Sequence, residues 1–244
     1  LTDRGRLPTP DDYPAGDAEV RQATQPPLYF FVAAPLIALL DDGQPVPPGI
    51  HPATICPGAD VDLGRTILYP PTNAYAFPPS GSALTGYALR LLGIAFGLGA
   101  IAATYHLGRT LFPSHRWIAV GAAALLACEP NTIQMTVTIS NDGLLLLIAA
   151  LNLVALARLV TTQRPWLVLI VLITGVLAVL TRLQGWAVLA LSALVVLSWI
   201  AARLWQMRRR ASRRAWITAL AAIAALLIAG GALAVFNLTQ YGSI

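Results

Sequence analysis

The chain contains no lysine, and charged residues of every kind make up only 11% of its 244 residues. Soluble globular domains carry about 25% charged residues, so the low charge excludes an ordinary soluble domain. Hydrophobic residues make up 57% of the chain instead. Because a segment that crosses lipid must satisfy its backbone hydrogen bonds internally, this composition predicts an all-α, polytopic membrane protein.

Acidic residues are scarce after residue 63, where only Glu129 and Asp142 occur, whereas nine others precede it. The sixteen basic residues are all arginine, and six of them lie between Arg203 and Arg214. That basic run separates two apolar segments, which is typical of a cytoplasmic loop rather than of a nucleic-acid interface. We therefore expect membrane lipid, and no nucleic acid, as a partner.

Cysteine is limited to Cys56, in a polar region, and Cys128, in an apolar run. Two such residues provide neither a disulfide framework nor a metal-ligand spacing. The chain starts at Leu1 and has no basic stretch followed by an apolar one, so it shows no signal peptide. From this start we expect a fragment of a longer membrane protein, with at least one earlier span that delivers Leu1 to the outside.

The first 86 residues are too polar to cross a bilayer. Residues 1–27 and 41–86 are rich in proline and aspartate, and their backbone polar groups would be unpaired in lipid. The apolar stretch 28–40 is shorter than the roughly 20 residues that a span needs, which predicts an interfacial or re-entrant helix. We expect residues 1–86 to form a large extracytoplasmic loop that contains this helix.

Apolar segments then follow one another as expected for a series of about six transmembrane helices. Glu129-Pro130 interrupts the second of them, which predicts a broken or tilted helix. The predicted transmembrane domain covers residues 87–236, and residues 237–244 begin a further outer loop. The expected spans are Tyr87–Leu111, Trp117–Met135, Gly143–Val160, Trp166–Thr181, Gln184–Leu204 and Trp216–Phe236.

The placement of arginine predicts the orientation of these spans. The first, third and fifth connections are flanked or filled by arginine, and such connections stay in the cytoplasm. The connections near 136–142 and 181–184 then fall outside, together with both ends of the chain. We expect this topology in a bacterial plasma membrane. The arginines assigned to the inside are Arg109, Arg116, Arg158, Arg164 and those of 203–214.

Ionisable residues at membrane depth are functional candidates, because they are costly there. Four lie near the predicted outer face, namely Arg90, Glu129, Asp142 and Arg182. Arg90 and Arg182 lie near the predicted outer face, although arginines beside the other spans lie on the predicted cytoplasmic side. An outer pair of guanidinium groups is suited to binding a phosphate. Alternatively, either arginine extends to the lipid headgroups and has no further function.

The two carboxylates leave several interpretations open. Asp142 begins its helix, so it caps that helix, pairs with Arg182 or Arg90, or orients a substrate. Glu129 stands next to a proline, and it is either a functional group or the end of its helix.

Small residues at helical spacing occur in the first two spans. They are Gly93 with Gly97 and Gly121 with Ala124. We expect them to let helices approach closely, rather than to bind a ligand.

Several short strings resemble motifs of one enzyme family. The string Gln25-Pro26-Pro27-Leu28-Tyr29-Phe30 resembles the QPPLYY string of GT-C-type membrane glycosyltransferases, the relatives of protein O-mannosyltransferases and aminoarabinose transferases. The histidine that usually precedes this string is replaced by Thr24. Further stretches are similar to family motifs and follow the family order: Arg4–Pro8, Ala76–Leu92, Ile139–Leu145, Thr181–Gly185 and Asn237–Gly242.

The resemblance implies a membrane glycosyltransferase that moves a sugar from a polyprenyl-phosphate donor to an acceptor on the extracytoplasmic face. The acceptor is a protein, a lipid or a glycan. The family's catalytic acid is expected upstream of Leu1, so no catalytic residue is assigned here. The resemblance also allows a divalent metal in the full-length protein, although no ligand cluster in this chain argues for one. The substrate-binding candidates are Arg182, Arg90, Asp142, Gln25 and Tyr29.

Two alternatives to an active enzyme remain at this point. A non-catalytic member of the same fold would lack the upstream acid. A transporter or flippase would usually show paired broken helices or an internal repeat, and no such repeat is visible in the sequence.

Overall fold

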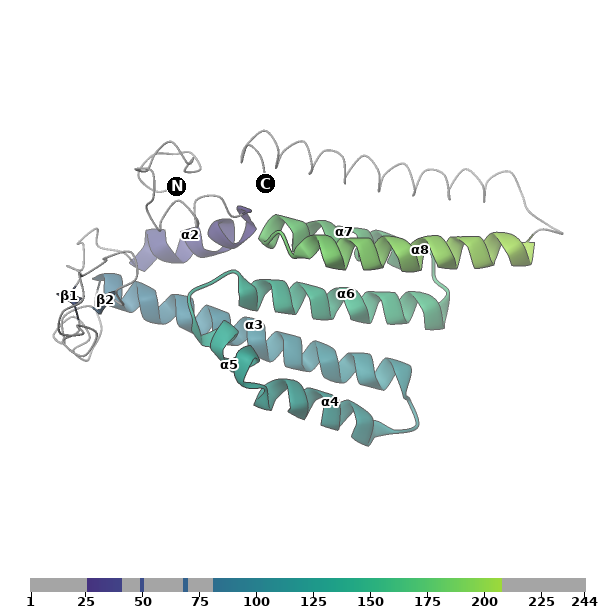
Figure 1. Ribbon diagram of the computed structural model, residues 1–244, viewed down its shortest axis with the longest axis horizontal. Coiled ribbons are helices and arrows are strands. Elements are labelled where there is room, and N and C mark those ends of the chain that lie inside the picture. Colours follow the sequence, from purple (N-terminus) through teal and green to yellow (C-terminus); the bar gives the residue numbers. More distant parts are fainter. Residues whose placement is uncertain (1–25, 41–48, 51–67, 70–80, 208–244) are drawn as a thin grey trace, which may run out of the picture. The chain divides into compact units, whose positions relative to one another are not determined.

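The structure is a computed structural model, which describes residues 26–40, 49–50, 68–69 and 81–207. The described residues form seven helices and one antiparallel ladder, in which Gly49 pairs with Tyr69 and Ile50 with Leu68. The fold is therefore all-helical, as predicted, apart from this two-residue ladder. The elements are α2 (Leu28–Leu40), β1 (Gly49–Ile50), β2 (Leu68–Tyr69), α3 (Gly81–Leu111), α4 (Arg116–Cys128), α5 (Pro130–Val137), α6 (Asp142–Thr162), α7 (Leu167–Thr181) and α8 (Gly185–Met207) (Figure 1).

Three helices are long and apolar enough to cross a membrane, over Ala83–Leu111, Asp142–Thr162 and Gly185–Arg203. They correspond to the first, third and fifth predicted spans. At the fourth predicted span, α7 has 15 residues, and the sixth lies outside the described residues. The count of six spans and the outer loop over residues 1–86 therefore stay predictions. The short helix predicted near 28–40 is present as α2.

The second predicted span is broken at Glu129, as its sequence predicted. Glu129 ends α4 and also precedes α5, with an extended backbone at φ −75° and ψ 118°. The residue before a proline avoids helical dihedrals, and Pro130 is well suited to the first turn of the next helix. The Glu129 carboxylate accepts a hydrogen bond from the Thr132 N–H, so it caps α5. Glu129 thus acts as a helix boundary.

The first long helix begins at Gly81, earlier than the predicted start at Tyr87. Gly81 has a φ of 54°, a conformation that favours glycine, and the Thr85 hydroxyl donates to its carbonyl over 3.2 Å. The short segment before Tyr87 is less apolar than the span, but it contains no proline after Gly81 and continues the helix. The predicted boundary was placed where the sequence becomes apolar, whereas the helix begins where its backbone hydrogen bonds begin.

The described chain divides into two compact units. The first holds residues 30–40, 49–50, 68–69 and 81–92, and the second holds 26–29 and 93–207. In the second unit, successive helices run in opposite directions along the long axis of the view, except that α5 continues from α4 (Figure 1). The connections 112–115 and 163–166 lie at one end, whereas 138–141 and 182–184 lie at the opposite end.

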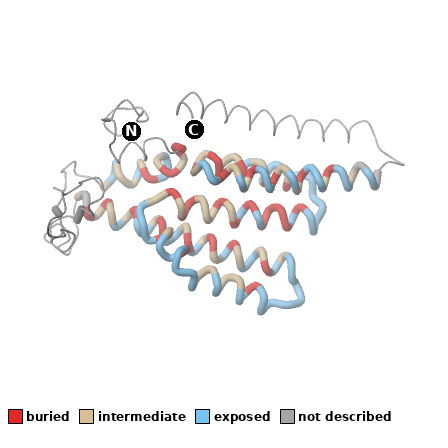
Figure 2. Tube along the Cα trace, viewed as in Figure 1, coloured by how far each residue is buried: buried red, intermediate tan, exposed pale blue. Residues whose placement is uncertain are grey.

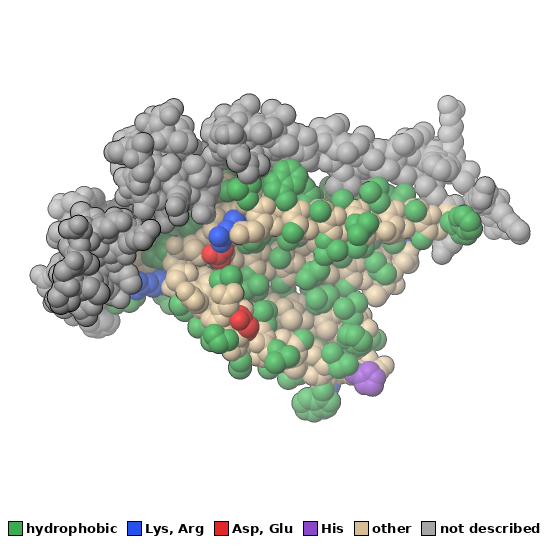
Figure 3. Space-filling model, viewed as in Figure 1, with side chains coloured by type: hydrophobic (Ala, Val, Ile, Leu, Met, Phe, Trp, Pro, Cys, Tyr) green, Lys and Arg blue, Asp and Glu red, His purple; other side chains and the backbone are tan. Residues whose placement is uncertain are grey.

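The core of the second unit lies among α6, α7 and α8. Leu159, Val171 and Val196 are fully buried there, and buried positions line the facing sides of these helices (Figure 2). On the face that Figure 3 shows, apolar side chains cover much of the described surface, with few charges between them. Leu125 and Leu194, for example, are 75% and 64% exposed. An outward-facing apolar surface is suited to contact with lipid hydrocarbon.

A polar contact also crosses this core at Asn152, whose side chain is fully buried. Its amide nitrogen donates to the Val171 carbonyl over 3.0 Å and to the Thr174 hydroxyl over 2.8 Å. Its amide oxygen accepts from the Ser192 hydroxyl over 2.9 Å. One side chain of α6 therefore connects α7 and α8, as interhelical polar groups commonly do in membranes.

The predicted close packing at Gly93 and Gly97 is confirmed. A Cβ at Gly93 would overlap the Thr136 carbonyl oxygen, and one at Gly97 would lie 2.6 Å from the Thr136 Cγ2. The two glycines therefore let α5 lie directly against α3. By contrast, a Cβ at Gly121 would meet nothing within 4 Å, so the expected close packing at Gly121 is wrong among the described residues.

Candidate functional site

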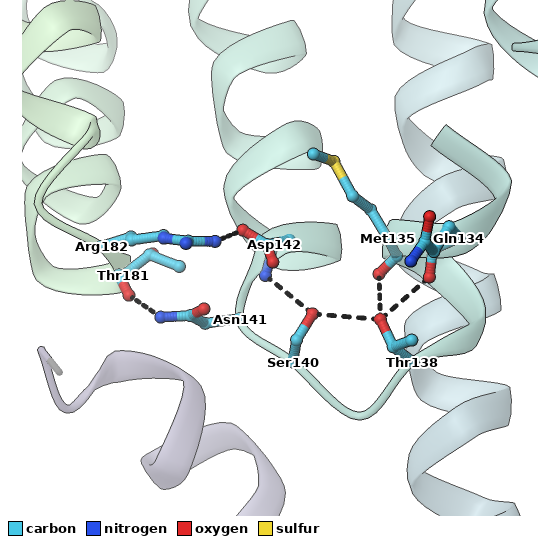
Figure 4. Close-up of polar contacts among 8 residues, drawn as sticks. All are labelled: Gln134, Met135, Thr138, Ser140, Asn141, Asp142, Thr181 and Arg182. Atoms are coloured by element: carbon cyan, nitrogen blue, oxygen red, sulfur yellow. Dashed lines mark hydrogen bonds and ion pairs between the residues drawn. The ribbon is translucent and has the colours of Figure 1, made fainter. Parts of the chain in front are cut away.

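The first turn of α6 and the last turn of α7 meet at the end of the second unit where Asp142 and Arg182 lie. The Arg182 guanidinium forms an ion pair with the Asp142 carboxylate (Figure 4). The Arg182 side chain is 30% exposed and that of Asp142 is 23% exposed. The pair is thus partly sheltered by protein but still accessible from outside. Of the two arginines proposed as partners of Asp142, the structure brings Arg182 to it.

A second contact lies directly beside the ion pair. The amide nitrogen of the buried Asn141 donates to the backbone carbonyl of the buried Thr181 over 2.8 Å. Asn141 therefore bonds to Thr181, and the next residue, Asp142, pairs with Arg182, which follows Thr181 (Figure 4). The Asn141 contact holds the backbone that carries Arg182, so the position of Arg182 does not depend on the ion pair alone.

The local sequence explains why Arg182 projects at this point. α7 ends at Thr181, and Arg182 turns to extended dihedrals of φ −162° and ψ 152°. The Gly185 N–H donates to the Arg182 carbonyl over 2.8 Å, and α8 begins at once. A Cβ at Gly185 would overlap the backbone of Ala178, so glycine permits this tight turn.

Asp142 occupies the first position of α6, whereas Asn141 holds the cap position without a side-chain cap hydrogen bond. The interpretation of Asp142 as a simple N-cap is therefore wrong. A carboxylate in the first turn is nevertheless stabilised by the helix dipole.

Polar groups extend from the ion pair toward α5. The Asp142 N–H donates to the Ser140 hydroxyl over 3.4 Å, and the Ser140 and Thr138 hydroxyls lie 3.5 Å apart. Thr138 also donates to the carbonyls of Gln134 and Met135, over 2.9 Å and 3.5 Å. Figure 4 shows these polar groups beside the ion pair, on the side toward α5.

The remaining predicted site residues are placed as follows. Arg90 is exposed on α3 and belongs to the first unit, so its grouping with Arg182 stays a prediction. Tyr29 is only 6% exposed at the start of α2, and burial raises the pKa of its phenol above the ordinary value. The phenol is therefore neutral at physiological pH. Gln25 lies outside the described residues.

No three His, Cys, Asp or Glu side chains cluster as a possible metal site within the described part of the chain. Among the described residues of the candidate site, the carboxylate is that of Asp142, and it is engaged by Arg182. These residues do not form a metal-ligand set, and no chemical step is assigned to a metal here.

Comparison with protein families matches residues 81–233 to the family described as dolichyl-phosphate-mannose-protein mannosyltransferase. The match covers more than half of the chain, including both residues of the ion pair. The chain belongs to this family. No curated protein and no solved structure matches it.

Membership of the dolichyl-phosphate-mannose-protein mannosyltransferase family confirms the resemblance to GT-C-type glycosyltransferases that the short strings indicated. Together with the three long apolar helices, it makes this chain an integral membrane protein of a glycosyltransferase family.

Sequence reasoning missed two polar contacts of this family member, one at the candidate site and one in the core. Asn141 was noticed only as part of a motif string, and its bond to Thr181 joins residues 40 positions apart. Asn152 lies in an apolar run. A lone amide side chain in such a run indicates an interhelical hydrogen bond, but the predictions did not include one. In both contacts at least one acceptor is a backbone carbonyl. Every residue has a backbone carbonyl, so the sequence does not indicate which one is the partner.

Proposed function

We propose that this chain takes part in transferring a sugar from a polyprenyl-phosphate donor to an acceptor hydroxyl on the extracytoplasmic face, with Arg182 binding the donor phosphate. The observation that carries the proposal is the ion pair between Arg182 and Asp142. It places an oriented guanidinium group at an accessible end of the helices.

The chemistry of the leaving group favours an arginine at this place. When the bond between sugar and phosphate breaks, negative charge develops on the phosphate, and a fixed cation stabilises it. A guanidinium group has five N–H donors in a planar fork, so one edge is able to contact Asp142 while another contacts a phosphate oxygen. Asp142 therefore acts in this proposal as the residue that orients Arg182.

The sidedness of the reaction is proposed from the arginine distribution. Arg109, Arg116, Arg158 and Arg164 lie beside the connections at one end of the second unit, and positively charged connections stay in the cytoplasm. Arg182 and Asp142 lie at the other end, which is then extracytoplasmic. The outer loops proposed over residues 1–86 and 237–244 would cover this same side of a six-span domain at 87–236.

The sugar and its acceptor are proposed to lie beside the charged pair. The Thr138 and Ser140 hydroxyls extend from Asp142 and are suited to hydrogen bonding with sugar hydroxyls. Arg90, Gln25 and Tyr29 are proposed to complete the binding site. The general base that accepts the acceptor's proton is expected before Leu1, and the acceptor is a protein, a lipid or a glycan.

The deciding experiment compares two arginine variants of the full-length protein. Arg182→Ala is expected to lower release of polyprenyl phosphate from a labelled polyprenyl-phosphate sugar by about 100-fold or more, since it removes a charge-stabilising donor. Arg109→Ala is the control, because Arg109 is exposed at the opposite end, and its turnover should stay at the wild-type level. Both variants should insert normally into the membrane. Unchanged turnover in Arg182→Ala would remove Arg182 from the donor site.

A further inference from the structure

The connection between α6 and α7 contains a residue in an unusual conformation. Gln163 has φ 58° and ψ 27°, and it is the one non-glycine residue with positive φ in the described ranges. This left-handed conformation at a helix C-terminus is normally occupied by glycine or asparagine. The Gln163 N–H closes α6 by donating to the Leu159 carbonyl over 3.0 Å. A glutamine in this position therefore needs support from its own side chain.

Two residues of α8 provide that support. The Gln163 Oε1 accepts from the Trp199 indole N–H over 2.8 Å and from the Arg203 Nε over 3.2 Å. The Gln163 backbone carbonyl accepts from the Arg203 Nη2 over 2.7 Å. The Arg203 guanidinium also lies over the Trp199 ring, 5.1 Å from its centroid. We call Gln163, Trp199 and Arg203 the Gln163 bracket.

The bracket fixes a guanidinium group without neutralising its charge. The bonds to Gln163 use two of the five N–H donors of Arg203, so three remain for another ligand. Both acceptors on Gln163 are uncharged. Because the group is held by hydrogen bonds and by the Trp199 ring, it loses little freedom when it binds an anion.

The surroundings of the bracket are strongly basic. The exposed arginines Arg109, Arg116, Arg158 and Arg164 lie beside the connections at the same end of the unit. Five more arginines occur between residues 208 and 214, and the sequence from Gly143 to Ile244 contains no Asp or Glu. The sequence after Asp142 therefore supplies no acidic side chain as a counter-charge.

We propose that the Gln163 bracket binds the phosphate of an anionic phospholipid headgroup. The chain belongs to a membrane protein, so phospholipid phosphates are abundant at the ends of its spans. The planar guanidinium fork matches a phosphate, and a tryptophan indole prefers the membrane interface. Anionic lipids in the cytoplasmic leaflet attract basic segments in the same way. This binding is independent of glycosyl transfer at the opposite end.

The test measures retention of phosphatidylglycerol and phosphatidylcholine by the purified full-length protein, by native mass spectrometry in detergent. Arg203→Gln and Gln163→Gly should each weaken retention of phosphatidylglycerol by about tenfold, the loss expected for one charge-assisted contact. Gln163→Gly keeps the charge of Arg203 and suits the positive φ. It removes the two bonds to the Gln163 Oε1 and leaves the bond from Arg203 to the backbone carbonyl. Retention of phosphatidylcholine should be weak and equal in all variants.

Arg109→Gln is the matched control, because it removes the same charge from the same end but leaves the bracket intact. It should change phosphatidylglycerol retention by less than about threefold. Wild-type retention in Gln163→Gly, or equal retention of the two lipids, would overturn the proposal. Full displacement of the lipid by millimolar inorganic phosphate would also overturn it, in favour of a free anion. A circular dichroism spectrum of each variant checks that it is folded.

Discussion

The Asn141 amide donates to the Thr181 carbonyl over 2.8 Å, immediately beside the ion pair of the next residues along each turn. This bond is buried and joins α6 to the end of α7. It places the backbone of the α7–α8 turn independently of any charge. Asn141 is therefore a positioning residue for Arg182 in the proposed reaction.

Asn141→Ala is expected to lower sugar transfer by about tenfold or more, because small displacements of a positioned group reduce rates steeply. Loss of the hydrogen bond should cost about 1 kcal/mol of stability. The informative measurement is turnover in the double variant with Arg182→Gln. If Asn141 acts through Arg182, its loss should add little in that background. Fully additive effects would contradict the positioning role.

The charge exchange Arg182→Asp with Asp142→Arg separates structure from chemistry. Each single variant places two like charges side by side at this partly buried contact, so each should unfold at a lower temperature than the wild type. The exchanged pair should recover part of that stability, although an arginine in the first turn of α6 costs about 0.3–1 kcal/mol. Turnover should not recover, because the guanidinium has moved. Recovery of turnover together with stability would show that the pair is purely structural.

Gly93 and Gly121 form a matched pair for testing helix contact. Gly93→Ala should destabilise the protein by about 1–3 kcal/mol, because the new methyl group overlaps the Thr136 carbonyl. Gly121→Ala meets nothing within 4 Å and should be neutral or stabilising, by up to about 1 kcal/mol, through higher helix propensity. Thermal unfolding in detergent measures both. Equal effects of the two substitutions would argue against the close contact of α3 and α5.

Asn152 tests how much a buried polar contact contributes in this membrane domain. Ser192 and Thr174 each also donate to a carbonyl of their own helix, so Asn152→Leu leaves both hydroxyls bonded. We expect that variant to lose only about 0.6–1.7 kcal/mol, the range for interhelical hydrogen bonds in membranes. Asn152→Asp places a charge among the helices and should cost about 2.5–3.5 kcal/mol. We therefore predict that Asn152→Asp destabilises the protein more than Asn152→Leu does, as measured by unfolding in mixed micelles. A larger loss in Asn152→Leu would contradict it.

Much of the helical part could be predicted from local sequence. Hydropathy located α3, α6, α7 and α8 within a few residues, since a span must bury its own backbone hydrogen bonds. The break at Glu129-Pro130 was also predictable, because proline restricts the residue before it. The start of α3 at Gly81 was not, since hydropathy does not report where hydrogen bonding begins.

The candidate site was predictable only in part. Arg182 and Asp142 were identified because charges are rare at membrane depth, but their pairing was one of several alternatives. The Asn141–Thr181 bond and the Gln163 bracket could not be predicted, because each contains a backbone carbonyl or an unusual φ that no residue pattern marks. Arg203 and Gln163 are 40 residues apart.

The sequence by itself determined that the chain is apolar and helical, where its helices break, and which few charges are available for function. These properties depend on interactions of each residue with lipid, water and its near neighbours. The tertiary structure alone decided that Arg182 binds Asp142, that Asn141 holds Thr181, and that Gln163 orients Arg203. Those contacts form only when separate helices pack, because packing brings together side chains and carbonyls that lie far apart along the chain.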